Sequence, residues 1–253
     1  MLDRWLAAAE ARYLADLTRR EVGRALRALS SCYVERREKL AAGHALEGRG
    51  KRAAFALYYG PLHFLAVRAI ARALNQPDGT RPSPTGPAQP RVVVDVGCGT
   101  GTAGAAWALE TGAEVRGFDL SAWAVEEADW TYRALGVRGR ARRGSVAEMR
   151  QPTTPSTILA AFVINELDEQ TRGLALQRLV AAANAGHRVV VIEPIARGVT
   201  PWWNAWRAAL EPLGGHARDW RFQVELPALL RDFDKSAGLD HRELTARSLS
   251  VGI

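Results

Sequence analysis

The chain has 253 residues, of which 47% are hydrophobic and 24% charged, with a formal net charge of +7. This balance is typical of a globular protein with one large domain, or one domain and a smaller helical part. The sequence has no long uncharged apolar run, few cysteines and an N-terminus that carries acids, which argues against a membrane span, a disulfide framework, a zinc site and a secretory signal. We therefore expect a reducing, cytoplasmic location, with no metal and no membrane partner.

Residues 1–74 predict an N-terminal helical cap. Apolar residues recur at helical spacing over the first 17 positions. A second helix is expected over about 20–42, and a third over 55–74 with a break near Gly60-Pro61.

The positive charge is concentrated in this part of the chain. Residues 1–75 hold 14 Lys and Arg against 7 Asp and Glu, whereas the remaining residues hold 20 of each. Two interpretations stay open. The basic helices bind an anionic partner such as RNA, or they present a solvated, arginine-rich face.

Residues 75–90 are rich in Pro and Gly and predict a linker. Beyond it, short apolar runs alternate with stretches rich in Ala and Leu; the runs are 92–96, 115–119, 157–163 and 188–193. Such alternation is typical of βαβ units and a parallel sheet, so residues 91–253 predict an α/β domain.

The strongest motif is the first strand with the loop that follows it. Residues 92–104 read VVVDVGCGTGTAG, and a helical stretch comes next. Glycines at the end of a buried strand let the backbone approach a ligand closely, as in nucleotide-binding α/β folds. The spacing differs from the G-x-G-x-x-G dinucleotide pattern, and no P-loop Lys-Ser/Thr pair is present.

Asp119 ends the second strand, 24 residues after Asp95. An acid at this position of such a fold can accept both hydroxyls of a ribose. Alternatively, Asp119 or Ser121 caps the following helix, and the two roles are compatible.

The segments VVVDVGCGTGTAG and GFDLS resemble motifs I and II of class I S-adenosylmethionine-dependent methyltransferases. The resemblance covers roughly residues 85–253. The resemblance implies a Rossmann-like, seven-stranded, mostly parallel sheet whose last strand is antiparallel, methyl transfer as the activity, and S-adenosylmethionine as the cofactor. It implies that Asp119 holds the ribose and that Asp95 orients the loop. The expected cofactor-binding residues are Asp95, Gly97, Cys98, Gly99, Gly101, Asp119, Leu120, Ser145, Val146 and Asn165.

The sequence departs from the family pattern after the third strand. Ser145 stands where an Asp often bonds the adenine amino group. A serine hydroxyl or a neighbouring backbone group can still accept that hydrogen bond, so we expect weaker cofactor binding rather than none.

The fourth strand ends in Asn165 and Glu166, which are the candidate catalytic residues. This edge of an open α/β sheet faces the ligand, and Glu166 is a candidate general base. The alternative is that Asn165 caps the loop and Glu166 is solvated. The sequence lacks both the N/D-P-P-Y/F motif of amino methyltransferases and a Pro-Cys nucleophile pair.

A narrower similarity links FVINELDEQTR and VVVIEPIARG to methyltransferase-like proteins associated with the small ribosomal subunit. The helix YYGPLHFLAVRAIARAL and the segment Asp219-Trp220-Arg221-Phe222 are also similar to elements of that family. The family's cysteine cluster for an iron–sulfur centre is missing here.

Trp202, Trp203 and Trp206 gather at the start of a later helix. They form either an aromatic wall for a flat acceptor or part of the core against the N-terminal helices. The sequence thus predicts methyl transfer to RNA or to a ribosomal component. Two alternatives remain, a small-molecule methyltransferase favoured by these tryptophans, and a cofactor-binding assembly factor with little turnover.

Overall fold

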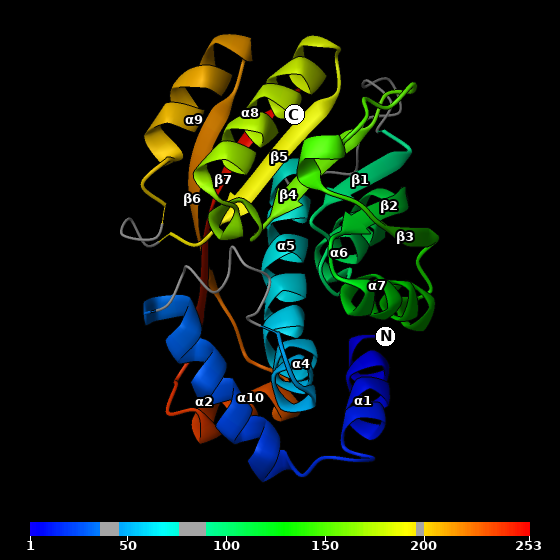
Figure 1. Cartoon of the computed structure of the whole chain (residues 1–253), viewed down its shortest axis with the longest axis vertical. Helices are drawn as coiled ribbons and strands as arrows, with labels where there is room; N and C mark the ends of the chain where they lie inside the picture. The colour runs from blue at the N-terminus through cyan, green and yellow to red at the C-terminus, as the bar shows by residue number, and fades with distance from the viewer. Residues whose placement is uncertain (36–45, 76–89, 196–199) are drawn as a thin grey trace. The chain divides into compact units, whose positions relative to one another are not determined.

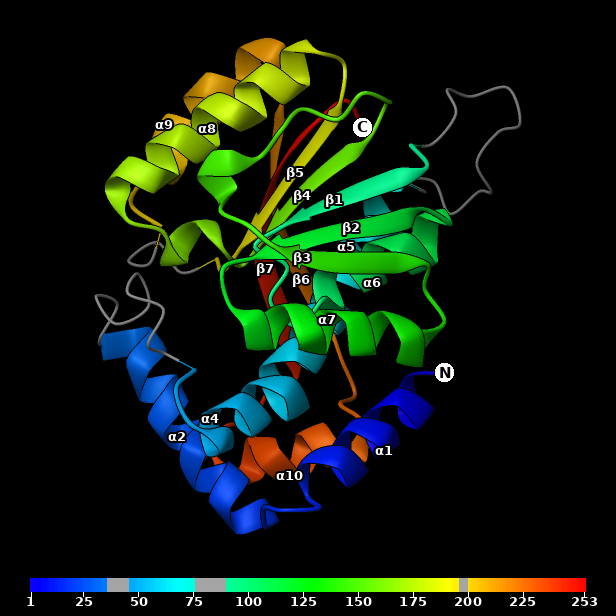
Figure 2. The same cartoon turned by 45° about the vertical axis from the view of Figure 1, so that its right-hand side comes forward.

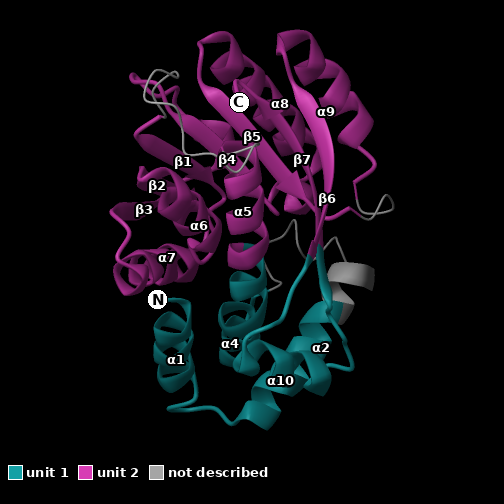
Figure 3. Ribbon diagram, turned by 180° about the vertical axis from the view of Figure 1, so that it is seen from behind, with its two compact units in different colours: residues 1–63, 223–244 teal, residues 64–222, 245–253 magenta. Residues whose placement is uncertain are grey.

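The computed structural model describes residues 1–35, 46–75, 90–195 and 200–253. They form two compact units, coloured separately in Figure 3: residues 1–63 with 223–244, and residues 64–222 with 245–253. The expected linker at 75–90 lies almost entirely outside the described residues, and the two units divide within a helix, between residues 63 and 64.

The first unit is helical. Its elements are α1 (Leu2–Tyr13), α2 (Arg19–Glu35), α4 (Arg49–Ala54), the π-helical segment η1 (Phe55–Tyr59) and α10 (Ala228–Ser236). Buried side chains on each helix form its core, with Trp5, Leu26 and Phe233 at most 2% exposed. The helix expected over 20–42 is α2, and residues 36–45 lie outside the described part. The unit includes residues 223–244, which the predicted cap did not.

The break expected at Gly60-Pro61 is wrong, because one helical run extends from Arg49 to Asn75. Its last part is α5 (Gly60–Asn75), and η1 comes directly before it. The N–H of Gly60 bonds the carbonyl of Phe55, five residues back. A proline clashes with the carbonyl four residues earlier in a regular α-helix, and a π-turn relieves this clash without ending the helix.

By length and composition, this run is also able to cross a membrane. It has 27 residues, and the mean hydropathy of its most apolar window is 1.2. However, 72% of that window is buried inside the protein, and a buried core helix meets the same criterion.

The second unit is built on a seven-stranded sheet in the order β3-β2-β1-β4-β5-β7-β6. The strands are β1 (Val92–Val96), β2 (Glu114–Asp119), β3 (Gly139–Arg143), β4 (Thr157–Ala161), β5 (Arg188–Glu193), β6 (His216–Gln223) and β7 (Glu243–Val251). The first five pair in parallel, and β7 runs antiparallel to β5. The predicted α/β, Rossmann-like, mostly parallel sheet is therefore confirmed.

Helices cover both faces of this sheet (Figures 1 and 2). One face is covered by α6 (Thr102–Thr111), α7 (Ala122–Leu135) and the second part of α5, and the other by α8 (Glu169–Asn184) and α9 (Trp203–Leu210). The described part of the unit also contains three short turns of 3-10 helix: η2 (Val146–Glu148), η3 (Ile164–Glu166) and η5 (Glu211–Leu213).

The tryptophan cluster belongs to the core of this unit. Trp202, Trp203 and Trp206 are at most 8% exposed and share one apolar cluster with residues of β1, β4, β5 and α8. An aromatic wall open to an acceptor is therefore wrong. The packing partners include the sheet and α8, which the sequence interpretation did not name.

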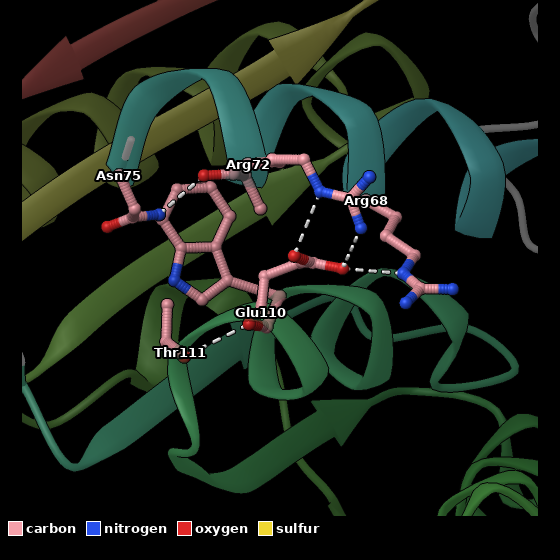
Figure 4. A network of polar contacts seen from close by, with 7 residues as sticks. Arg68, Arg72, Asn75, Glu110 and Thr111 are labelled. Atoms are coloured by element: carbon pink, nitrogen blue, oxygen red, sulfur yellow. Dashed lines mark hydrogen bonds and ion pairs between the residues drawn. The ribbon is translucent and has the colours of Figure 1, made fainter. Parts of the chain in front are cut away.

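An ion-pair network joins α5 to α6 (Figure 4). Arg68 Nε lies 2.6 Å from Glu110 Oε1, and Arg72 Nε donates to Glu110 Oε2 at 3.2 Å. Burial raises the pKa of Glu110, but hydrogen bonds from the two arginines outweigh it and hold the pKa below its ordinary value. The network fixes α6, the helix that directly follows the glycine loop.

Candidate active site

The carboxyl ends of the parallel strands bring the predicted site residues to one edge of the sheet. Asp95 lies near the end of β1, where its carboxylate Oδ2 accepts a hydrogen bond from the N–H of Gly104 at 2.9 Å. Gly104 has no room for a larger side chain, because a Cβ there would lie 2.5 Å from Asp95 Oδ2. Asp95 therefore ties the strand to the first turn of α6 across the loop, as expected of a loop-orienting residue.

The glycine loop requires its glycines for conformation and for space. Gly97, Gly99 and Gly101 have φ angles of 64°, 51° and 76°, a region that other residues rarely adopt. A Cβ on Gly97 would collide with the side chain of Val163, in the segment after β4. Gly97 thus allows the segment after β4 to pack directly on the loop.

Asp119 holds this loop from the side. Its Oδ2 accepts from the N–H of Gly99 at 3.0 Å, and its Oδ1 accepts from the N–H of Ser121 at 2.9 Å. The helix cap itself is Ser121, whose hydroxyl accepts from the N–H of Ala124. An ionised carboxylate has about four acceptor sites, so Asp119 retains capacity for ribose hydroxyls.

The side chain of Cys98 is directed into the packing rather than toward a ligand. It is 5% exposed, and burial raises the pKa of its thiol well above the ordinary value. A Cβ on Gly117 of β2 would lie 2.9 Å from the Cys98 sulfur, so Gly117 makes the space that the thiol fills. Cys98 has only its backbone to offer a cofactor.

Three predicted residues flank the loop beyond β2 and β3. Leu120 is 66% exposed, an unusual state for a leucine beside a buried strand. Ser145 caps η2 by accepting from the N–H of Ala147 at 3.2 Å, and Val146 is buried behind it. The Ser145 hydroxyl still has its own proton to donate.

Glu193, at the end of β5, organises the acceptor side. Its Oε1 accepts from the N–H of Ile164 at 2.8 Å and from the N–H of Asn165 at 3.2 Å. Glu193 is fully buried, and its Oε2 has no hydrogen-bond partner among the described residues. The predicted catalytic residues Asn165 and Glu166 therefore stand on a backbone turn that this carboxyl holds.

The two buried acids of this edge hold a proton more readily than they would in water. Burial is the largest cause in each case, and it raises the pKa of Asp95 to about 7 and that of Glu193 to about 8. The negative charges of Asp119 and Glu166, respectively, add to the effect. A neutral Glu193 carries its proton on one oxygen, while the other oxygen still accepts two N–H groups.

The sequence did not single out Glu193 as a site residue. The signal was an acid at the end of an apolar strand, the same pattern that identified Asp119 on β2. What the sequence does not show is that β4 and β5 are neighbours, which places Glu193 beside the turn after β4.

Residues 93–186 match a family model described as "Methyltransferase domain". The matched segment begins on β1, ends just after α8 and includes the glycine loop, Asp119 and Asn165. The chain contains a class I methyltransferase domain. Methyltransferases of this class take their methyl group from S-adenosylmethionine, which is the cofactor of this domain.

Several solved structures are similar to the chain at low identity. Magnesium protoporphyrin IX methyltransferase from Synechocystis PCC 6803 with bound SAM is 16% identical, with a TM-score of 0.48 over 75% of this chain and 80% of that one. A putative RNA methyltransferase from Pyrococcus horikoshii is 15% identical, with a TM-score of 0.48 over 76% and 86%. No curated protein matches the chain. The assignment of the methyltransferase domain depends on the family match and the strand order, not on these alignments.

The residues at this edge fit the cofactor. The glycine loop leaves its backbone free of side chains beside the Asp119 carboxylate, and Leu120 supplies exposed apolar surface for a flat ring. Within the loop, the buried hydroxyl of Thr100 finds no hydrogen-bond partner in the part of the chain that the structure describes. Such an orphaned polar atom is expected where a ligand completes the hydrogen bonding.

Proposed function

We propose that this methyltransferase acts on RNA, with a ribosomal RNA as the favoured acceptor. The observation that carries this proposal is the concentration of positive charge in residues 1–75, which contain the whole net excess of the chain. Nucleic-acid binding depends on arginine and lysine that neutralise phosphates. The similarity of the segments after β4 and β5 to small-subunit-associated methyltransferase-like proteins supports the ribosomal choice.

Some of these basic side chains form ion pairs within the first unit. Arg19 pairs with Glu10 and Asp232, and Arg49 pairs with Asp16. Other arginines of the first unit are exposed and have no ion pair within the described residues; they are Arg4, Arg20 and Arg24. These are the side chains of the first unit that we assign to phosphate contacts.

A small-molecule acceptor has less support. That alternative was based on the lack of acceptor-specific motifs and on the aromatic cluster of Trp202, Trp203 and Trp206, and these three side chains are core residues. Buried tryptophans of this kind stabilise the fold and offer no surface on which an acceptor can stack.

At the site, each residue has a distinct role. S-adenosylmethionine supplies an activated methyl group when it is bound. Asp119 and the glycine loop hold the ribose and methionine parts, and Leu120 packs on the adenine. Glu166 accepts the proton that the acceptor loses, Asn165 orients the acceptor, and Glu193 keeps both on one rigid turn.

The test is incubation of the purified full chain with methyl-tritiated S-adenosylmethionine and total RNA from the same organism. We expect label in the RNA that ribonuclease releases and protease does not. Label in a protein or in a small molecule would contradict the RNA acceptor. Binding of the cofactor without transfer to any fraction would favour the assembly factor instead.

A further inference from the structure

We propose that the outer edge of the sheet, at β3, is a docking surface for the phosphate backbone of the RNA acceptor. We call it the β3 arginine surface and define it by Arg116, Arg138, Arg140, Arg142 and Arg150. It belongs to the catalytic unit and is separate in sequence from the basic N-terminal helices. The inference rests on the proposed RNA acceptor and names where on the catalytic unit that RNA binds.

The surface comes from a local concentration of arginine. Residues 133–150 contain six arginines and a single acid, Glu148. The long segment from residue 76 onward is neutral as a whole, so its net charge conceals this cluster. Local rather than summed charge determines how a surface attracts a polyanion.

Four of the five arginines are not neutralised by the protein, whereas Arg116 Nε pairs with Glu114 Oε1 at 3.3 Å. Arg138, Arg140, Arg142 and Arg150 are exposed and have no ion pair within the described residues. Other arginines of the same unit are paired, such as Arg68 and Arg72 with Glu110, and Arg207 with Glu211. The protein thus pairs several arginines elsewhere in this unit and leaves Arg138, Arg140, Arg142 and Arg150 without an ion pair among the described residues.

Strand geometry aligns three of these side chains. Side chains of paired residues in neighbouring strands project from the same sheet face, and Arg116 of β2 pairs with Arg140 of β3. Arg142 lies two residues further on and therefore projects from that face too, whereas Ala141 between them is buried. Gly139 faces α7, because a Cβ there would lie 3.0 Å from Tyr132. The arginines therefore project from the face opposite α7.

On that face Arg116, Arg140 and Arg142 are exposed, whereas Phe118 near the end of β2 is buried in one apolar cluster with Val146 of η2 and Met149. The helices on that side, α8 and α9, lie over the other half of the sheet, as Figure 2 shows. β3 is the outermost strand and pairs only with β2. The three arginine side chains are thus accessible from solvent.

The edge recognises its partner through side chains rather than through strand addition. The backbone N–H of Ala141 already donates to Asp129 Oδ1 at 2.7 Å, so it is not available to a further strand. Guanidinium groups present several donors in a planar fork that matches phosphate oxygens. Among polyanions, this chemistry fits a phosphate backbone.

The surface ends at the cofactor site. Gly144, directly after β3, donates its N–H to the Asp119 carbonyl at 3.0 Å. Arg143 Nε donates to the Leu120 carbonyl at 3.3 Å. RNA bound along β3 therefore extends to Asp119 and Leu120, which we assign to binding of the methyl donor.

The experiment compares two triple variants of the full chain that lose the same charge. R138Q/R140Q/R142Q removes the β3 arginine surface, and R178Q/R207Q/R218Q removes three exposed arginines elsewhere in the unit. The probe is a fluorescein-labelled 30-nucleotide RNA, read by anisotropy from 50 to 300 mM salt. Calorimetry with S-adenosylhomocysteine verifies that each variant is folded and binds the cofactor product.

We expect the first variant to bind RNA at least about tenfold more weakly and to lower the salt slope by about two, while the second stays within about twofold of wild type. An equal loss of RNA affinity in the two variants would overturn the proposal. The arginines would then serve only to prevent another strand from pairing with the exposed sheet edge. Tighter binding of a DNA of the same sequence or of a polyglutamate peptide would overturn the choice of RNA. Wild-type RNA binding without RNA methylation would refute the proposed function while leaving this surface intact.

Discussion

Glu193 of β5 holds Asn165 through a hydrogen bond from the backbone N–H of Asn165 to Glu193 Oε1, at 3.2 Å. The same oxygen accepts from the neighbouring Ile164 at 2.8 Å. One carboxyl therefore fixes the turn that carries both candidate catalytic residues. On its other side this turn continues back to Val163, which packs on Gly97 of the glycine loop.

We expect E193A to lower methyl transfer strongly, because two buried N–H groups lose their acceptor and the turn moves. Each unsatisfied group costs about 1–3 kcal/mol, which urea denaturation will measure as lost stability. E193Q retains a carbonyl acceptor and is expected to retain most of the activity. The role assigned to Glu193 is wrong if the alanine variant is as active and as stable as wild type.

The pH dependence of stability tests whether Glu193 titrates as a buried acid. Burial raises its pKa to about 8 in the folded protein, against an ordinary value of 4.5. Between these values the folded state binds more protons than the unfolded state, so the free energy of unfolding falls as pH rises from about 4.5 to about 8. Urea denaturation at pH 5 and pH 8 is expected to show a smaller fall in E193Q, where this group cannot titrate. An unchanged fall would show that Glu193 is not the titrating group.

Gly97 is expected to be essential for the contact between the loop and the turn after β4. In G97A the new methyl group collides with Val163, so we expect loss of S-adenosylmethionine binding in calorimetry. The control is G112A, which has a similar φ of 72° but no atom within 4 Å of the added Cβ. Adding V163A to G97A removes the colliding atoms and is expected to restore part of the affinity. If G97A and G112A have the same effect, backbone strain alone explains both.

Asp119 is expected to bind the ribose as well as the loop. D119A removes an ionised acceptor, and each hydrogen bond to such a group contributes about 1.5–3 kcal/mol. Calorimetry is expected to show at least about tenfold weaker cofactor binding. S121A removes only the helix cap, so it lowers stability by about 0.5–2 kcal/mol and leaves affinity unchanged. If D119A and wild type bind the cofactor with equal affinity, Asp119 has only a structural role.

The first unit is formed by two segments of the chain, and we expect the protein to become insoluble when only one of them is deleted. Leu230 and Phe233 of α10 are buried in the unit that residues 1–63 also form. Deletion of residues 1–63 leaves these side chains exposed, and we expect insoluble protein. Replacing residues 223–244 by a short Gly/Ser linker in the same deletion is expected to restore solubility, measured by sedimentation of the lysate and size-exclusion chromatography. A soluble single deletion would contradict a shared core.

The sequence predicted those features that depend on neighbours along the chain. The strand before Gly97, the loop itself and Asp119 are all local patterns, and the four strands placed by apolar runs are present. Long-range features were missed. The role of Glu193 depends on the pairing of β4 with β5. β6 is mostly exposed, and only its second half alternates the apolar Trp220 and Phe222 with polar residues, a short local pattern that the sequence interpretation did not use. Residues 223–244 join the first unit through packing that no local pattern encodes.

The arginines of β3 illustrate another limit of sequence reasoning. The net charge was taken over long segments of the sequence. In such a sum, the positive charge of a basic strand is offset by acids that lie elsewhere in the segment. Only the sheet order reveals that β3 is an edge and that Arg116 and Arg140 share a face.

The most direct test of the account is a crystal structure of the full chain with S-adenosylhomocysteine. We expect both ribose hydroxyls within hydrogen-bond distance of the Asp119 carboxylate, the adenine against Leu120, and the homocysteine part along Gly97 and Gly99. The sulfur is expected to face the turn of Asn165 and Glu166. A ligand bound elsewhere, or a ribose that does not contact Asp119, would contradict the proposed active site.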